Sequence, residues 1–159
     1  MAGSWRNRHC GYVWPKVPAP ATDKSNMFEW TPEYVVGICS IDAQHRRLFA
    51  IGRELYAAMS AGRGSSVLAR ILDRLVQHTA VHFAYEEHLM QLYEYPDFAR
   101  HKAEHDAMVK QVLAFQAEFN GGRATVAVVV LRFIKDWMEK HIKGTDFAYV
   151  PFMNAQKVA

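Results

Sequence analysis

Apolar residues recur at steps of three and four along most of the chain from Glu29 onward, which is the spacing of one face of an α-helix. Residues with poor helix propensity, mostly glycine, proline and asparagine, interrupt this pattern at three places. The helices expected between these breaks cover about residues 41–59, 67–92, 96–119 and 124–142. Amphipathic helices with short connections pack as a bundle, so we expect an all-α fold, an antiparallel up-down-up-down four-helix bundle.

One part of the fourth segment favours a different structure. Residues 126–130 are mostly valines, which have high strand propensity, and in isolation they favour a buried strand. The helical period continues from there through His141, over a length that strands rarely reach. The longer pattern therefore favours a helix.

The first 26 residues differ in composition from the rest. They contain Pro15, Pro18 and Pro20 and show no helical period, so we expect residues 1–26 to form a disordered, non-helical N-terminal extension. An alternative is that translation starts at Met27. In either case we expect residues 27–159 to form one domain, because a chain of this length is typical of a single domain. The extension also carries the whole net charge of +3, and the balanced charge of the remainder predicts no nucleic-acid partner.

Membrane insertion and secretion are not expected from this sequence. The longest apolar stretch, about residues 124–131, is too short to span a bilayer, and no basic start leads into an apolar signal segment. Cys10 and Cys39 lack the spacing of a metal-binding or redox pair, and two unpaired thiols are typical of a reducing compartment. The sequence therefore predicts a cytoplasmic protein.

Histidines and carboxylates interrupt the apolar faces of all four expected helices. Ionisable groups on a buried face are costly unless something compensates them. Steps of four residues within two of the helices place pairs of these side chains one turn apart, and imidazole with carboxylate suits a first-row transition ion. The residues expected to bind metal are His45, His82, Glu86, His101, His105, His141 and Asp146.

This set of ligands is too large for one octahedral ion. If Glu86 and Asp146 each bridge two ions and one solvent oxygen bridges as well, all but one of the coordination positions of two octahedral ions are filled. We expect an exogenous ligand to bind at the remaining position. His141 and Asp146 lie five residues apart, which in a regular helix separates them by about 140°. A π-type turn or a helix end is therefore expected between them, with Gly144 making the departure easy.

The same residues, in their local motifs, resemble the bacterial hemerythrins over about residues 28–152. The motifs, in order, are Trp30-Thr-Pro-Glu-Tyr-Val-Val-Gly-Ile, Ile41-Asp-Ala-Gln-His45, His82-Phe-Ala-Tyr-Glu86-Glu87, His101-Lys-Ala-Glu-His105 and Trp137-Met-Glu-Lys-His141-Ile-Lys-Gly-Thr-Asp146. The resemblance implies two iron ions in a non-haem di-iron centre, with a bridging oxo or hydroxo group, and reversible binding of dioxygen. It also implies that His101, His105 and His141 hold one iron, that His45 and His82 hold the other, and that Glu86 and Asp146 bridge them.

These expectations describe an oxygen carrier, store or scavenger rather than an enzyme, with nitric oxide or azide as further ligands of the open position. The alternatives are a sensing module for oxygen or nitric oxide, for which no second domain fits here, and a di-iron oxidase or peroxidase. A carboxylate-rich site of the ferritin type uses Glu-x-x-His pairs, and the chain has none. His78 shares the face of His82, either as a core histidine bonded to backbone or water, or as a proton relay.

Overall fold

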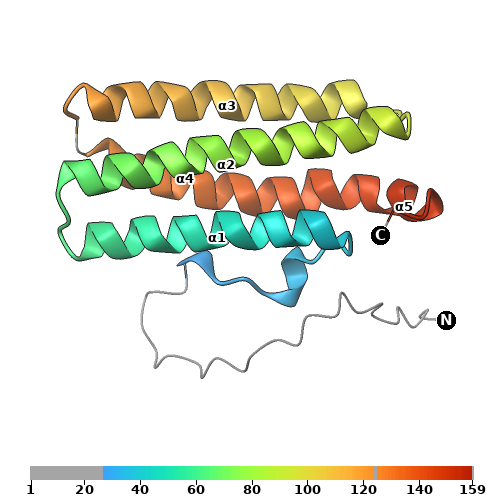
Figure 1. The fold of residues 1–159 in the computed structure, drawn as a ribbon, viewed down its shortest axis with the longest axis horizontal. Helices are drawn as coiled ribbons and strands as arrows, with labels where there is room; N and C mark the ends of the chain where they lie inside the picture. The colour runs from blue at the N-terminus through green and yellow to red at the C-terminus, as the bar shows by residue number, and fades with distance from the viewer. Residues whose placement is uncertain (1–26, 124, 159) are drawn as a thin grey trace.

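Four long antiparallel helices form the bundle seen in the computed structural model, which describes residues 27–123 and 125–158 (Figure 1). Each long helix packs against two of the others, which closes the bundle in the up-down-up-down order predicted from the sequence. The predicted fold class is confirmed, whereas the predictions made for residues 1–26 lie outside the described residues. The helices are α1 (Cys39–Ser60), α2 (Ser65–Leu92), α3 (Phe98–Asn120) and α4 (Val126–Lys140).

Two of the predicted breaks contain glycines that the turns require. Gly62 follows α1 with φ +61° and Gly122 follows α3 with φ +93°, in the left-handed region that L side chains rarely adopt. At the other end of α1, the buried carboxylate of Asp42 accepts hydrogen bonds from the backbone N–H groups of Val36 (2.8 Å) and Gly37 (3.1 Å). These bonds fix the direction in which the chain enters α1.

The segment of residues 27–38 packs along α1 and belongs to the folded part of the chain (Figure 1). Phe28 is 1% exposed, and the short 3₁₀ helix η2 (Pro32–Tyr34) follows it. The Trp30 ring packs edge-on against Phe49, with ring centroids 5.3 Å apart, and its centroid lies 6.4 Å from that of His45. This entry segment therefore covers the part of α1 that carries a candidate metal ligand.

The fourth helical segment is longer than the sequence pattern predicted. Residues 126–130 are helical, as the period favoured, but helical structure does not end near Ile142. The chain passes through the π-helix η3 (His141–Asp146) into α5 (Phe147–Ala155). Gly144 and Pro151 both disfavour helix, yet burial of Tyr149 and Met153 in the core keeps α5 against the bundle. The expected end of this segment was wrong for that reason.

The cysteine interpretation also needs correction. Cys39, at the start of α1, is disulfide-bonded. The expectation of unpaired thiols is therefore wrong for Cys39. Separately, no helix within residues 27–123 or 125–158 is both long and apolar enough to cross a membrane.

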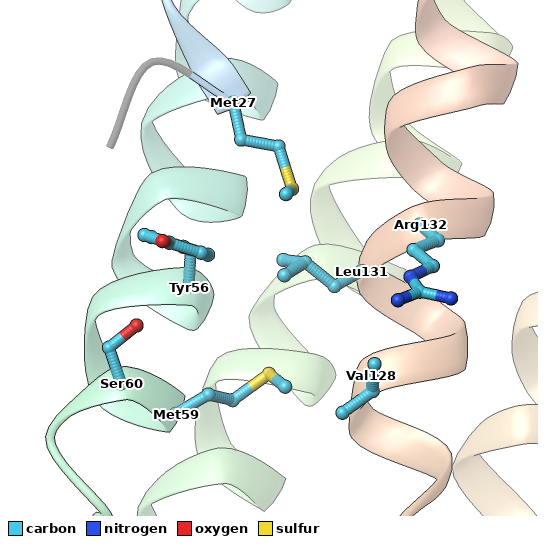
Figure 2. Close-up of a pocket in the computed structure, with 7 residues that line it drawn as sticks. All are labelled: Met27, Tyr56, Met59, Ser60, Val128, Leu131 and Arg132. Atoms are coloured by element: carbon cyan, nitrogen blue, oxygen red, sulfur yellow. The ribbon is translucent and has the colours of Figure 1, made fainter. Parts of the chain in front are cut away.

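A groove of about 330 Å³ lies between α1 and α4, away from the candidate ligands. Its lining residues are Met27, Tyr56, Met59, Ser60, Val128, Leu131 and Arg132 (Figure 2). Tyr56 follows His45 by eleven residues on α1, which places it roughly 16 Å along the helix axis. None of the seven candidate ligands lines this groove, so the site is built elsewhere in the bundle.

Candidate metal centre

All seven side chains predicted to bind metal converge in the interior of the bundle. Each is at most 3% exposed. The long helices contribute five of them, and the two ends of η3 contribute the rest. By element they are His45 on α1, His82 and Glu86 on α2, His101 and His105 on α3, and His141 and Asp146 in η3.

Glu86 directs its two carboxylate oxygens at different imidazoles. Its Oε1 lies 3.7 Å from His82 Nε2 and 3.9 Å from His45 Nε2. Its Oε2 lies 3.3 Å from His105 Nε2 and 3.6 Å from His101 Nε2. One oxygen thus faces the pair from α1 and α2, while the other faces the pair from α3.

Asp146 shows the same division. Its Oδ2 lies 3.2 Å from His45 Nε2. Its Oδ1 lies 3.1 Å from His141 Nε2 and 3.5 Å from His101 Nε2. The two carboxylates therefore lie between two imidazole groups, and each presents one oxygen to each group. The assignment of these two imidazole groups to two separate ions stays a prediction.

The atoms that face inward lack hydrogen-bond partners, which tests whether metal fits. The buried atoms without a partner include His45 Nε2, His82 Nε2, Glu86 Oε2 and both carboxylate oxygens of Asp146. The remaining three imidazoles point their Nε2 atoms at one another, 3.0 Å apart from His101 to His105 and 3.1 Å apart from His105 to His141. Converging lone pairs of this kind suit a cation, because a buried unpaired acceptor is otherwise costly.

Six of the seven residues form two groups that could each hold a metal ion, and Asp146 belongs to neither group. One consists of Glu86, His101, His105 and His141, and the other of His45, His82 and Glu86. In both groups the ligand atoms lie within 4.8 Å of one another. Glu86 belongs to both groups, as a bridging carboxylate would.

Outer hydrogen bonds orient three of the imidazoles. His82 Nδ1 lies 2.9 Å from Gln44 Oε1, His105 Nδ1 lies 3.1 Å from Glu87 Oε1, and His141 Nδ1 lies 3.2 Å from Glu104 Oε2. An acceptor at Nδ1 fixes the tautomer that leaves Nε2 free to bind metal.

Aromatic rings pack on two of these imidazoles. Phe83 stacks on His105 with centroids 3.7 Å apart, and Trp137 stacks on His141 with centroids 4.1 Å apart. Both contacts limit rotation of the imidazole and exclude water from its face. These stacked rings and the outer acceptors hold the inward-facing atoms in place.

Tyr149 is a site residue that the sequence did not reveal. It is fully buried on α5, and its hydroxyl donates a 2.7 Å hydrogen bond to Glu86 Oε1. Burial, followed by the nearby carboxylates of Glu86 and Asp146, raises the pKa of this phenol well above its ordinary value. Tyr149 therefore stays a hydrogen-bond donor at any working pH. Tyr149 follows Asp146 by three residues, which would place both on one helix face. That spacing could have indicated a site residue only if the sequence had predicted helix α5.

His78 contacts a backbone carbonyl group. Its Nε2 lies 3.0 Å from the carbonyl oxygen of Gln44, and it is partly buried. A carbonyl accepts a proton in a hydrogen bond but does not pass one on. The structure shows the predicted bond of His78 to backbone, although the residue is only partly buried, and this contact offers no path for a proton relay.

Burial strongly shifts the titration of His82. It lowers the pKa of His82 from 6.5 to about 4, despite the opposing charge of Glu86. Between these pH values the unfolded chain binds a proton that the folded chain does not. The stability of the metal-free protein should therefore fall as pH drops from 6.5 to 4, by roughly 3 kcal/mol at most from this group.

Urea unfolding of the metal-free protein at pH 4.5 and pH 7 measures this effect. His82→Gln should lose clearly less stability than wild type over the same interval, because the other titrating groups are present in both proteins. Equal losses in the two proteins would show that His82 does not carry the effect.

The predicted departure from regular helix between His141 and Asp146 is confirmed, since these residues form one π-helical turn. The wider turn places both side chains in the same site, with His141 Nε2 only 3.1 Å from Asp146 Oδ1. The part expected of Gly144 is not supported. Its backbone lies outside the left-handed region, and a Cβ built there meets no atom within 4 Å.

Gly144→Ala should therefore keep the metal content of wild type, contrary to the expectation from the sequence. Alanine has the higher helix propensity, so stability should stay equal or rise by up to about 1 kcal/mol. Iron analysis and thermal unfolding measure both quantities. Loss of metal from a normally helical Gly144→Ala protein would mean that alanine draws the turn back to a regular α-helix.

Comparison with known proteins identifies the family. Residues 36–153 match the family model described as the hemerythrin HHE cation binding domain. The chain belongs to the hemerythrin family. A bacteriohemerythrin of Methylococcus capsulatus is 35% identical over 130 residues, which is 81% of this chain and 98% of that protein. A hemerythrin-like protein of Naegleria gruberi is 34% identical over 129 residues, which is 81% of this chain and 96% of that protein.

A solved hemerythrin structure supports the same assignment. The crystal structure of wild-type hemerythrin superposes with a TM-score of 0.73 at 35% identity, covering 77% of this chain and 95% of that chain. The four-helix architecture of the hemerythrin family is therefore shared by this chain. All seven candidate ligands fall within the region matched by the family model.

Proposed function

We propose that this hemerythrin-family chain binds dioxygen reversibly at a non-haem di-iron centre, as an oxygen carrier, store or scavenger. The observation that carries the proposal is the arrangement of Glu86 and Asp146, each with one oxygen toward each of two imidazole groups. Carboxylates bridge paired metal ions in this way. The similar proteins from Methylococcus capsulatus and Naegleria gruberi, a bacteriohemerythrin and a hemerythrin-like protein, support the same activity.

In this proposal the seven side chains divide between two irons. His101, His105 and His141 would hold one iron, and His45 and His82 would hold the other. Glu86 and Asp146 would each offer an oxygen to both irons, and an oxo or hydroxo group would complete the centre. When bound, the iron pair supplies the electrons that dioxygen needs in order to bind. The group with two histidines offers fewer ligand atoms, so dioxygen, azide or nitric oxide would bind on that side.

The surrounding residues keep this centre apolar and fixed. Trp30 and Phe49 cover the His45 side, and the hydroxyl of Tyr149 holds the Glu86 carboxylate by donating to Oε1. Five neutral imidazoles supply little negative charge to stabilise high-valent iron, which favours binding over oxidation of a substrate. The proposal is therefore a binding protein rather than an enzyme. Sensing of oxygen or nitric oxide is the second function that the same open position would allow.

One set of spectra tests the proposal. The protein loaded with iron under air should contain about two irons per chain and show a charge-transfer band that disappears on deoxygenation and returns with air. Azide added to the oxidised protein should change the spectrum and compete with dioxygen. A content of one iron per fully loaded chain would refute the dinuclear centre. An oxidised spectrum unchanged by azide would mean that a protein ligand closes the open position.

Domain limits, partners and cellular location complete the proposal. We assign residues 27–159 to one hemerythrin domain, and the balanced charge of this part gives no reason to add a nucleic-acid partner.

A cytoplasmic location was predicted from unpaired thiols, but disulfides are unusual in reducing compartments and Cys39 is disulfide-bonded. Fractionation of cells after rapid alkylation of free thiols tests the location and the oxidation state together. Recovery outside the cytoplasm would end the cytoplasmic prediction.

A further inference from the structure

The π-turn η3 is the least regular part of the site and must be held in place. Single π-turns are rare within helices and cluster at functional sites. Neither end of η3 has a side-chain cap, and Gly144 is not required by backbone conformation or by space. Both terminal residues of the turn, His141 and Asp146, are candidate ligands. A contact from outside the turn is therefore needed to explain why the wide geometry persists.

Glu104 supplies such a contact. Its Oε2 accepts a 2.7 Å hydrogen bond from the Thr145 hydroxyl and lies 3.2 Å from His141 Nδ1. Thr145 directly precedes Asp146, so one carboxylate oxygen contacts both ends of the turn. Glu104 lies on α3 between His101 and His105, and therefore ties η3 to the helix that carries two other candidate ligands. Its second oxygen faces Arg100 at 3.6 Å and does not compete for these contacts.

The ion pair between η3 and the entry segment is a weaker tie. Lys143 Nζ lies 2.8 Å from Glu33 Oε2, but the Glu33 side chain is 73% exposed. Exposed ion pairs of this kind contribute little to stability and are screened by salt. Lys143 also projects from the middle of the turn, whereas Glu104 contacts both ends. Of the two, Glu104 is the better placed to fix the positions of His141 and Asp146.

We propose that Glu104 is a positioning residue that clamps the π-turn, so that His141 and Asp146 face the same metal centre. The consequence for metal rests on the proposed di-iron site, but the consequence for the turn itself does not. The clamp would act through the hydrogen bonds of Glu104 Oε2 to both ends of η3. In this proposal Glu104 on α3, rather than Gly144, maintains the departure from regular helix between His141 and Asp146.

Three variants and a matched control test the clamp. Glu104→Ala removes both contacts, Thr145→Val removes only the hydroxyl donor, and Glu104→Gln keeps an acceptor oxygen without the charge. Glu118→Ala is the control, because Glu118 is also on α3, pairs with Arg123 rather than with any residue of η3, and has a side-chain exposure of 39% against 38% for Glu104. Far-UV circular dichroism should show the same helicity in all five proteins.

Two readouts separate the clamp from the metal proposal. In the metal-free proteins, the amides of residues 141–147 should exchange hydrogen about tenfold or more faster in Glu104→Ala than in wild type. After anaerobic loading with Fe(II), release of iron to a ferrous chelator should be about 10- to 100-fold faster in Glu104→Ala, which is the usual effect of losing an outer partner. Thr145→Val and Glu104→Gln should fall between wild type and Glu104→Ala, and Glu118→Ala should match wild type.

The outcomes are distinguishable. If Glu104→Ala matches Glu118→Ala in hydrogen exchange of residues 141–147, the clamp is overturned whatever the metal content. If wild type takes up no iron while the exchange difference is present, the clamp stands and the proposed di-iron function fails. Accelerated exchange spread evenly over α1 to α4 would indicate general destabilisation and would also overturn the clamp.

Discussion

Replacing Glu86 with glutamine is expected to remove metal from both halves of the site while the bundle stays folded. Glu86 is the residue shared by the two candidate metal-binding groups, and its two oxygens face different imidazoles. An amide has the same shape, but it offers one neutral oxygen and an NH₂ group that cannot bind a cation. We expect iron content to fall from about two per chain to well below one, a larger loss than His101→Ala should cause.

The metal-free Glu86→Gln protein should be less stable than metal-free wild type but should stay folded. Burial raises the pKa of Glu86, but the imidazoles of His82, His101 and His105 outweigh it and hold this pKa well below its ordinary value. The ionised carboxylate therefore contributes stability that the neutral amide lacks, although glutamine can still accept the hydrogen bond from Tyr149. Loss of iron from a protein that keeps its helical fold would mark Glu86 as a metal ligand.

Iron analysis and thermal unfolding of the metal-free proteins measure both effects. Glu54→Gln is the control, since Glu54 is an exposed glutamate on α1 that pairs with Arg74 at 2.8 Å, away from the site. The control should keep the iron content of wild type. Two irons in Glu86→Gln would show that this residue is not a bridge and would require another ligand for one group.

The sequence predicted most of this site because metal ligands are costly on an apolar face. His82 and Glu86, or His101 and His105, stand out against buried neighbours at helical spacing, whatever the rotation of each helix. The five-residue step from His141 to Asp146 was also informative, because a regular helix could not bring both to one place. Such signals depend on local geometry alone. They are therefore visible before any tertiary contact is known.

The outer layer of the site could not be predicted in the same way. Glu87 and Glu104 lie next to candidate ligands in the sequence, but a glutamate there is usually an ordinary solvent-facing charge, and both side chains are in fact partly exposed. Their contacts cross between helices and depend on the rotation of each helix in the bundle. Tyr149 reaches Glu86 only because η3 redirects α5. No local pattern encodes that redirection, and an aromatic residue at such a position is usually part of the core.

A second large effect is expected at Gly52, where the backbone of α1 makes a close approach to an aromatic ring. A Cβ built at Gly52 would overlap the ring of Phe28, which is 1% exposed and packed in the core. Gly52→Ala should therefore lower the free energy of unfolding by roughly 1–3 kcal/mol, as overpacking usually does, despite the higher helix propensity of alanine. Gly144→Ala is the matched control, since a Cβ there meets nothing within 4 Å.

A double-mutant cycle identifies the cause of that loss. Phe28→Ala removes the ring, so in that background Gly52→Ala should cost nothing and should even stabilise by up to about 1 kcal/mol through helix propensity. Urea unfolding of the four metal-free proteins gives the coupling free energy between the two sites. The entry segment that carries Phe28 also places Trp30 against the His45 side of the centre, so a displaced ring should expose residues 27–38 to protease. If Gly52→Ala destabilises equally with and without the Phe28 ring, the loss arises elsewhere in α1 and the close approach is not its cause.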